Sequence, residues 1–428
     1  MLADKVSGSL LGLWLLVPEH LRLGTWDLLV GWTGRPGDQV EPRLALQLIH
    51  EAALCVTGLR QKRSLSQKGF ELANGLPFVA ADPAIHDLLD AHTVAEAQAL
   101  QVALGKIRRA SGHFRGQVLA IDPHRMRSYS KRQMRRRQNT LDGSAYKTAQ
   151  TFFCLDVDTH QPIAFTTASS ARTVTQATPE LLAMVQNILN PTSTKPLVLA
   201  DTEHVSVELF DHVCQNTPFD LLVPLPRRQS LCQNLQTLDP GRFTPHWAGF
   251  ATATEPFHFA HSHTPLHQFI QRCGERPDQW QLKGFLCTSP HQALDPLTRD
   301  YPRRWHLEEF FHAHQALAWN RAGTLNLNIR YGQMTLALLA QAALHQLRLR
   351  LGPPFDSWEA AHFARTLLAG LEGDLRVHHD TLVVTFYNAP NADLLRHHHE
   401  NLPEKLAHQH VNPHVPRLYN FQLDFRFK

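Results

Sequence analysis

The chain has 428 residues, nearly three times the roughly 150 that one domain usually needs, so we expect two or three structural units with an ample core. Hydrophobic residues make up 43% and charged residues 19%, which excludes a disordered chain and a collagen-like repeat. The net charge is +4, and no early apolar stretch approaches the roughly 20 residues that cross a bilayer, so we expect no membrane span and no export signal.

The six cysteines are scattered and contain no C-x-x-C pair. This pattern predicts neither a zinc knuckle nor a disulfide framework, and it favours a reducing, cytoplasmic setting. The 28 histidines are also spread along the chain. Only the run His397, His398 and His399 is typical of a metal-binding tract, and a solvated helix face is the alternative.

Residues 1–115 are predicted to form a helical DNA-binding or accessory region. Within 41–60, apolar side chains recur at the spacing of one helix face, at Leu44, Leu48, Ala52 and Cys55. The pair Asp82-Pro83 is a helix start signal, and we expect the apolar stripe behind it to continue through Val102 to a basic end.

From Gly116 onward the pattern changes to short buried strands. The apolar run 118–121 ends in Asp122, and the run 197–200 ends in Asp201. Two further strands, over 149–155 and 163–167, are joined by a turn sequence. Helices are expected at 179–189 and 206–214, and a strand at 221–223. This alternation predicts the α/β class, with a mixed sheet covered on both faces.

Residues 226–281 lose that rhythm and are rich in polar, proline, histidine and aromatic residues. We expect them to form a mainly β or irregular insertion. A strand resumes at 285–288, and a long helix is expected from about Tyr301. The core is therefore predicted over 116–330, followed by a C-terminal helical and α+β cap over 331–428, a candidate dimerisation region.

The strongest chemical signal is the pair of strand-end carboxylates, Asp122 and Asp201, because mixed α/β sheets build their sites at the carboxyl ends of strands. Turn formation is the alternative for either residue alone. With Tyr301 as zero and about 100° per residue, Arg304, Glu308 and Gln315 fall within a sector of ~60° around it. Three carboxylates brought together would require cations, and oxygen-only ligands select hard ions such as Mg²⁺ or Mn²⁺.

The string Tyr301-x-x-Arg304-x-x-x-Glu308-x(6)-Gln315 resembles the Tyr-Arg-Glu-Lys signature of DDE transposases of the insertion-sequence family-four type. The order Asp122, Asp201, Glu308, with 79 (201 − 122) and 107 (308 − 201) positions between members, is similar to that family's triad and its inserted domain. The signature lysine is replaced by Gln315, which removes a cation that contacts phosphate in the family.

The resemblance implies an RNase H-like core that binds two divalent ions, Mg²⁺ or Mn²⁺, between Asp122, Asp201 and Glu308. It implies that Arg304 holds a DNA phosphate, that Tyr301 contacts one with its hydroxyl, and that Gln315 occupies the remaining DNA-contact position. Glu203 and His204 follow Asp201 closely enough to contact it.

A basic segment follows Asp122 directly. It holds seven cations and no acid in thirteen residues: Arg125, Arg127, Lys131, Arg132, Arg135, Arg136 and Arg137. Solvated charge runs usually mix signs, so this segment favours contact with a DNA backbone. In the insertion, Trp247 and Trp280 are candidates to stack on an unpaired base at a cleaved end, with burial as the alternative.

The hypothesis is a DNA transposase that cleaves double-stranded DNA at its element's ends and joins them to target DNA. The expected assembly is a homodimer in a synaptic complex, in the cytoplasm of a bacterium and on the nucleoid when bound to DNA. One alternative is a catalytically inactive DNA-binding derivative, and another is a plain metal-dependent nuclease. A nucleotide-processing enzyme is disfavoured because no Gly-rich phosphate loop is present.

Overall fold

The computed structural model describes residues 5–56, 65–128, 133, 136–138, 143–169, 171–314, 317 and 326–428. The chain divides into two compact units. One consists of Arg109–His312, which contains most of the core expected at 116–330. The other joins Met1–Arg108 to Ala313–Lys428. The N-terminal and C-terminal regions, which the sequence predicted as separate, thus share one unit. Within it, helix α12 (Leu327–Leu351) packs against α3 (Glu41–Ala53).

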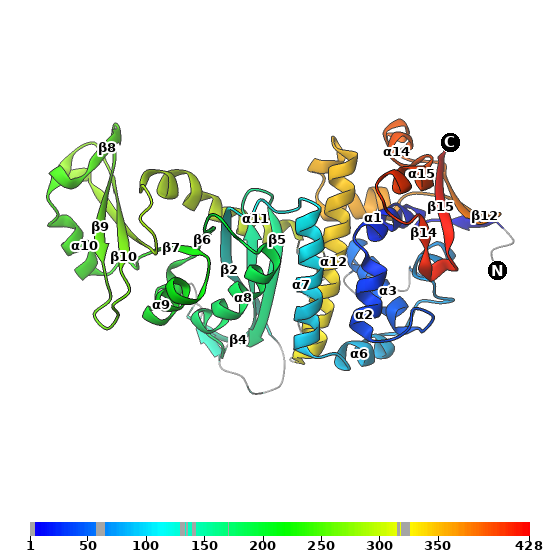
Figure 1. The fold of residues 1–428 in the computed structure, drawn as a ribbon, viewed down its shortest axis with the longest axis horizontal. Helices are drawn as coiled ribbons and strands as arrows, with labels where there is room; N and C mark the ends of the chain where they lie inside the picture. Colours follow the sequence, from blue (N-terminus) through cyan, green and yellow to red (C-terminus); the bar gives the residue numbers. More distant parts are fainter. Residues whose placement is uncertain are drawn as a thin grey trace. The chain divides into compact units, whose positions relative to one another are not determined.

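The Arg109–His312 unit is built on five strands whose spatial order is β5-β4-β2-β6-β7 (Figure 1). Strand β2 (Val118–Arg127) pairs antiparallel with β4 (Ala145–Asp156), which pairs antiparallel with β5 (Gln161–Ser169). On its other side, β2 is parallel to β6 (Leu197–Leu199), and β6 is parallel to β7 (Asp220–Pro224). Three hairpin-connected strands followed by two parallel ones form the RNase H-like mixed sheet that the sequence predicted.

Helices cover both faces of this sheet. On β5, the Thr166 hydroxyl donates to Glu180 of α8 (Val174–Leu189) over 2.7 Å. The neighbouring Phe165 packs instead against Phe153, whose ring also meets Phe310 of α11 (His306–His314). Because successive side chains of a strand point to opposite faces, α8 and α11 lie on opposite sides of the sheet. A third helix, α9 (Val207–Asn216), packs against β7.

The insertion continues the core sheet. It contains α10 (Gln229–Gln236), β8 (Thr244–Trp247), β9 (Phe250–Phe257) and β10 (Leu266–Cys273). Strand β8 pairs antiparallel with β9, β9 with β10, and β10 with β11 (Gln281–Cys287). Strand β11 in turn pairs antiparallel with β7. A small apolar cluster closes this part, formed by Leu235, Phe243, Ala251, Ala253 and Ile270.

Three local expectations were wrong. Strand β2 does not end at Asp122 but continues to Arg127, because β4 pairs with it along that length. The helix expected from Tyr301 begins as a 3-10 turn, Tyr301–Trp305, and becomes α-helical only at His306. The stripe behind Asp82 is divided into α6 (Asp82–Asp90) and α7 (Val94–Ala110), since the Thr93 hydroxyl accepts from the backbone N–H of Glu96 and caps a new helix.

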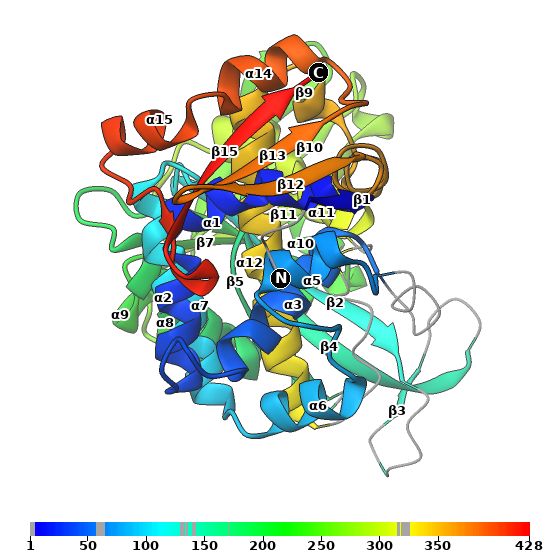
Figure 2. The same ribbon diagram turned by 90° about the vertical axis from the view of Figure 1, so that its right-hand side faces the viewer.

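The other unit combines helices with a five-stranded sheet of order β1-β12-β13-β15-β14 (Figure 2). Its strands are β1 (Val6–Gly8), β12 (Gly373–His378), β13 (Thr381–Phe386), β14 (His414–Val415) and β15 (Phe421–Phe427). Strand β1 was not expected in a helical N-terminal region; it pairs with β12, from the far end of the chain.

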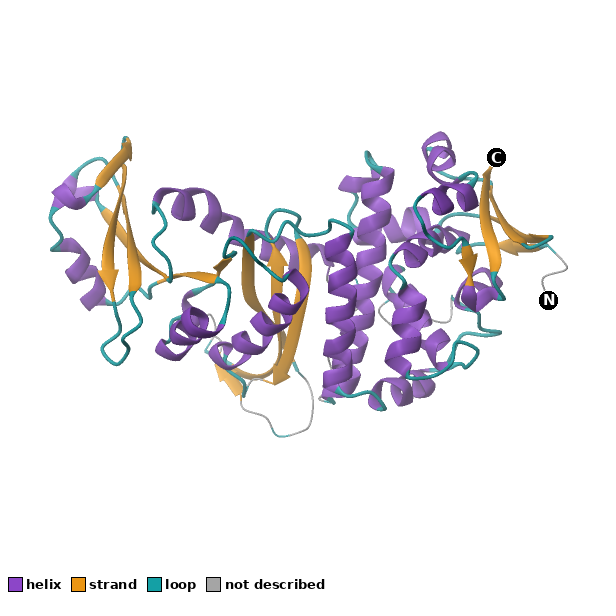
Figure 3. Ribbon diagram, in the orientation of Figure 1, coloured by secondary structure: helices purple, strands orange, loops and turns teal. Residues whose placement is uncertain are grey.

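Helices make up most of this second unit (Figure 3). Besides α3, α6, α7 and α12, it contains α1 (Val17–Arg22), α2 (Thr25–Thr33), α5 (Lys68–Asn74), α13 (Ala360–Phe363), α14 (Ala392–His399) and α15 (Leu402–His408). Both α14 and α15 pack against β15. Among the helices of the described residues, none has the length and hydrophobicity required to cross a bilayer.

Candidate active site

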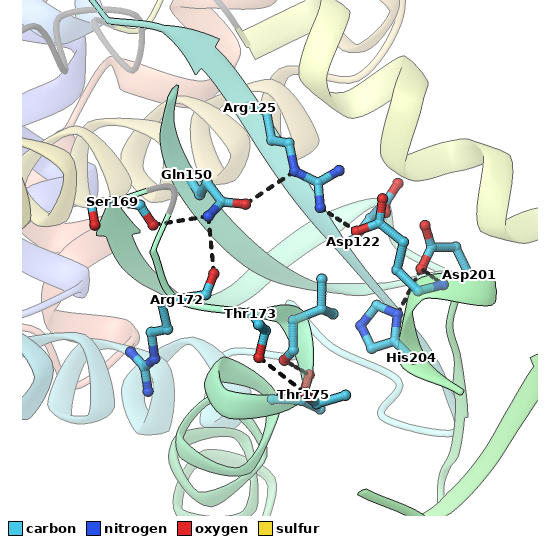
Figure 4. A network of polar contacts seen from close by, with 12 residues as sticks. Asp122, Arg125, Gln150, Ser169, Arg172, Thr173, Thr175, Asp201 and His204 are labelled. Atoms are coloured by element: carbon cyan, nitrogen blue, oxygen red, sulfur yellow. Dashed lines mark hydrogen bonds and ion pairs between the residues drawn. The ribbon is translucent and has the colours of Figure 1, made fainter. Parts of the chain in front are cut away.

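The pairing of β2 with β6 brings two predicted carboxylates to one edge of the sheet. Ala120 pairs with Leu199 in parallel, and each strand places an aspartate two positions further on, at Asp122 and Asp201. Figure 4 shows these two side chains next to each other, with His204 beside Asp201. The two strands therefore bring their carboxylates to the same edge of the sheet, as expected, although β2 itself continues beyond Asp122.

The segment 301–308 brings the remaining predicted residues to the same edge. Arg304 donates from Nη1 to Oδ2 of Asp122 over 3.1 Å, and the Tyr301 hydroxyl donates to the carbonyl oxygen of Ala200 over 3.4 Å. Glu308 lies in the first turn of α11, half-buried, and its charge acts on Asp122. The 3-10 turn alters the angular count of the helical wheel, but Arg304 still bonds to Asp122 and the charge of Glu308 still acts on that carboxylate.

Asp122 lies in the least favourable surroundings for a charged carboxylate within the site. Burial raises its pKa to about 7, opposed by the charge of Arg304 and reinforced by repulsion from Asp201 and Glu308. Its side chain is only 11% exposed. A buried carboxylate facing two others is the arrangement that a bound cation would stabilise.

Asp201 is held differently. Its Oδ1 accepts from Nδ1 of His204 over 2.7 Å and from the backbone N–H of Glu203 over 3.0 Å. Burial would raise the pKa of Asp201, but the hydrogen bond and charge of His204, with the Glu203 N–H, lower it below its usual range. His204 is almost fully buried, so it fixes the orientation of the Asp201 carboxylate. This confirms its expected contact with Asp201.

The donor set of the site fits a hard divalent cation. Asp122, Asp201 and Glu308 supply carboxylate oxygens only, and the pKa of Asp122 is raised mainly by burial and further by the negative charges of Asp201 and Glu308. The three carboxylates do not form the tightest ligand group among the described residues, since the group whose atoms all lie within 4.8 Å is His160, His306 and Glu309. The ligand atoms of the three triad carboxylates are therefore less tightly grouped, and Arg304 forms an ion pair with Asp122.

Part of the basic segment lies on strands beside the site. Arg125 is on β2, where Nε donates to Oε1 of Gln150 over 3.0 Å (Figure 4). Its guanidinium also forms an ion pair with Glu203. Arg127 ends β2, exposed, with its Cζ 5.1 Å from the ring centroid of Tyr146.

The rest of the segment is only partly described. Arg136 is exposed on β3 (Arg136–Gln138), a strand that also includes Arg137. The predicted contacts Lys131, Arg132, Arg135 and Gln315 lie outside the described residues.

Sequence reasoning missed one cation near the site. Lys283, on β11, has Nζ 4.9 Å from the ring centroid of Phe285 and 5.6 Å from that of Tyr301. Partial burial lowers its pKa, as do the charges of Arg227 and Arg304. Its closeness to two arginines marks a positive region at the edge of the site. Its sequence signal was only a lone lysine at the end of the insertion.

The two insertion tryptophans differ from each other. Trp247 is 54% exposed and lies on Phe250 with ring centroids 4.4 Å apart and planes 8° from parallel. The burial alternative is therefore wrong for Trp247. Trp280 is half-buried, with the Arg272 guanidinium 4.2 Å from its ring centroid.

Comparison with known families agrees with this geometry. A model of the transposase DDE domain matches residues 113–342, more than half of the chain and all of the described carboxylate site. The chain belongs to the DDE transposase family. This transposase is accordingly an enzyme that acts on DNA, with the mixed α/β core that its sequence predicted.

Comparison with solved structures gives a distant likeness. The transposase is similar to the cryo-EM structure of a piggyBac transposase synaptic complex with hairpin DNA, with a TM-score of 0.42 and 12% sequence identity. That likeness covers 86% of this chain and 82% of the other. A search of curated proteins finds no match.

Proposed function

We propose that this transposase cleaves double-stranded DNA at the ends of its element and joins the freed 3′ ends to target DNA, as an enzyme of the insertion-sequence family-four type. The observation that supports the proposal is the contact of Arg304 with Asp122, together with the charges of Asp201 and Glu308 that act on the Asp122 carboxylate. These carboxylates would hold two divalent ions, Mg²⁺ or Mn²⁺.

When bound, such ions acidify the attacking water or DNA 3′-hydroxyl and stabilise negative charge at the leaving 3′-oxygen. The chain's own residues prepare the site. His204 orients the Asp201 carboxylate, and the two strands fix Asp122 and Asp201 at one edge of the sheet. Burial around Asp122 keeps water from screening the charges there.

Arg304 and Tyr301 are the proposed phosphate contacts. The forked guanidinium of Arg304 suits two oxygens of a phosphate, and its bond to Asp122 keeps it at the site before DNA arrives. The Tyr301 hydroxyl lies within reach of the Ala200 carbonyl, directly before Asp201. Lys283 adds a cation in the same region, which offsets the lysine that Gln315 replaces.

The DNA backbone would follow the basic strands beside the site, along Arg125 and Arg127 on β2 and Arg136 and Arg137 on β3. We assign the same role to Lys131, Arg132 and Arg135 on their position in the sequence. Neutralising several phosphates makes binding steeply dependent on salt. Two DNA ends must be brought together, so we propose a homodimer on DNA, acting in the bacterial cytoplasm.

The terminal regions have accessory roles in this proposal. Residues 1–115 would contribute to DNA binding and residues 331–428 to dimerisation, around the core at 116–330. Deleting either region would disrupt one compact unit, because both contribute to it. Their roles are therefore better tested by surface substitutions than by truncation.

The test is a cleavage assay on duplex DNA carrying the inverted repeats that flank the gene, with Mg²⁺ or Mn²⁺. Asp122→Asn and Glu308→Gln should abolish cleavage while leaving the fold intact, because each removes charge with little change in size. The matched controls are Asp278→Asn and Glu208→Gln, at exposed positions outside the site, and these should cleave normally.

The outcomes separate the alternatives. Full cleavage by either site variant would refute the assignment of the triad. Cleavage without joined products would indicate a plain nuclease with the same metal centre. Specific binding of the repeats by the unsubstituted chain, with no cleavage under any divalent ion, would indicate an inactive DNA-binding derivative.

A further inference from the structure

A second group of metal-ligand side chains lies apart from the three carboxylates of the triad. His160 belongs to the turn between β4 and β5, while His306 and Glu309 lie in the first turn of α11. One ligand atom from each of the three lies within 4.8 Å of the others. Glu309 follows Glu308 directly, and about 100° of helix rotation separates neighbouring side chains, so the two glutamates point in different directions.

The chain itself holds this group together. The rings of His160 and His306 are stacked, with centroids 4.0 Å apart and planes at 29°. Nδ1 of His306 lies 2.9 Å from Oε2 of Glu309. His160 adopts φ of 56°, the left-handed conformation that turns the chain back into β5. The three side chains are therefore positioned by local backbone and ring contacts.

A separate ion pair fastens the same two segments to each other. Arg303 donates from Nη2 to Oδ1 of Asp158 over 2.5 Å and to the carbonyl oxygen of Val157 over 3.5 Å. This contact connects the β4–β5 turn to the residues just before α11 without using any of the three ligand groups. The two segments are thus held together before an ion binds, and an ion would replace the hydrogen bond between His306 and Glu309.

The chemistry of the group differs from that of the triad. Two imidazoles and one carboxylate suit Zn²⁺ and neighbouring transition metals, whereas three carboxylates suit Mg²⁺ or Mn²⁺. His160 and Glu309 are exposed, so an ion has access from solvent and a water can complete its coordination.

We propose that His160, His306 and Glu309 form a second metal site, selective for Zn²⁺ or a similar transition metal, which ties the β4–β5 turn to the first turn of α11. The ion would act structurally, by holding the helix that also carries Glu308 against the sheet. The site does not depend on the transposase reaction, and it can be tested on protein without DNA.

The experiment uses the full chain freed of metal and titrated with Zn²⁺ against a chromophoric chelator. Co²⁺ absorption serves as a second probe, because its visible bands report nitrogen and oxygen ligands in a low-coordinate site. The variants are His160→Asn and Glu309→Gln. The matched controls are His261→Asn, an exposed histidine of the insertion, and the double variant His397→Asn/His398→Asn on α14.

We expect one tight Zn²⁺ per chain, a rise in melting temperature on Zn²⁺ addition, and a loss of affinity of more than about tenfold in each site variant, with both controls unchanged. Unchanged affinity in His160→Asn and Glu309→Gln would overturn the proposal. Loss of Zn²⁺ binding only in the α14 double variant, or only in Asp122→Asn, would also overturn it, because the ion would then lie elsewhere.

Discussion

Arg304 and Asp122 form a partly buried ion pair in which the guanidinium Nη1 lies 3.1 Å from the carboxylate Oδ2. The two side chains come from positions 182 residues apart, one on β2 and one on the turn before α11. The arginine supplies positive charge beside the Asp122 carboxylate, which the charges of Asp201 and Glu308 also reach. A divalent ion held by Asp122 would supply the charge that Arg304 now provides there, which would leave the guanidinium available to a DNA phosphate.

Arg304→Lys should lower the rate of DNA-end cleavage by about 10- to 100-fold while leaving the melting temperature nearly unchanged. Lysine keeps the charge but loses the forked pair of donors that fits a phosphate. Single-turnover cleavage measures the effect. Arg303→Lys is the control, because its partner is Asp158 rather than Asp122, and it should cleave like the unsubstituted enzyme. Equal rates in both variants would show that Arg304 acts only through its charge.

Lys283→Gln should weaken binding of element-end DNA and reduce the slope of log affinity against log salt by about one unit. The expected cause is the loss of one phosphate contact near Tyr301. Filter binding or fluorescence anisotropy over a range of salt gives the slope. Lys195→Gln, an exposed lysine just before β6 and so at the opposite end of that strand from Asp201, should leave the slope unchanged. An unaltered slope in Lys283→Gln would remove this residue from the DNA path.

Trp247→Ala should reduce affinity for DNA with an unpaired base at its end by about tenfold, since stacking on an aromatic ring contributes about 1–3 kcal/mol per base. Its effect on stability should be small, because the ring is 54% exposed. Comparison of blunt duplex with frayed duplex isolates the stacking contribution. Tyr419→Ala, a highly exposed aromatic residue in the other unit, is the control. Equal losses on both DNAs would contradict a base-stacking role.

Phe153→Ala should destabilise the Arg109–His312 unit by about 3–5 kcal/mol. The Phe153 ring is fully buried and meets Phe165, Phe310 and Phe311, two of which belong to α11. Urea unfolding measures the loss. We also expect cleavage to fall, because this packing positions α11, the helix that carries Glu308. Phe78→Ala, at a site 65% exposed, should change stability by less than about 1 kcal/mol.

The unit that joins the two chain ends should lose stability in mild acid. Burial lowers the pKa of both His50 and His399 to about 3. The charge of Arg417 lowers the pKa of His50 further, and the charges of His398 and two arginines lower that of His399. Between about pH 6.5 and pH 3, the unfolded chain binds protons that the folded chain does not. As the pH is lowered through this range, the free energy of unfolding therefore decreases by about 1.4 kcal/mol per pH unit for each such histidine.

His399→Phe should reduce that acid sensitivity. Phenylalanine fills the space beside Phe425, whose ring centroid lies 5.4 Å from that of His399, and it has no proton to gain. Urea unfolding between about pH 5.5 and pH 4 should show a slope smaller by about 1.4 kcal/mol per unit. His408→Phe, at an exposed position of α15, should leave the slope unaltered. An unchanged slope in His399→Phe would mean that this histidine is protonated in the folded state.

The sequence by itself determined the two apolar strands that carry Asp122 and precede Asp201, the turn between β4 and β5, and the grouping of Tyr301, Arg304 and Glu308. These features follow from local patterns, because apolar runs, turn residues and helical spacing act over a few neighbouring positions. The family resemblance drew on the same short motifs, and the match to the transposase DDE domain confirmed it at family level.

Only the tertiary structure decided how distant segments meet. The pairing of β4 extends β2 beyond Asp122, β1 joins a sheet with β12 from the far end of the chain, and Lys283 reaches the region of Arg304. His160 meets His306 in the same way, across 146 (306 − 160) positions. Such contacts depend on which surfaces bury one another once the chain is folded, and no local pattern of residues records that choice.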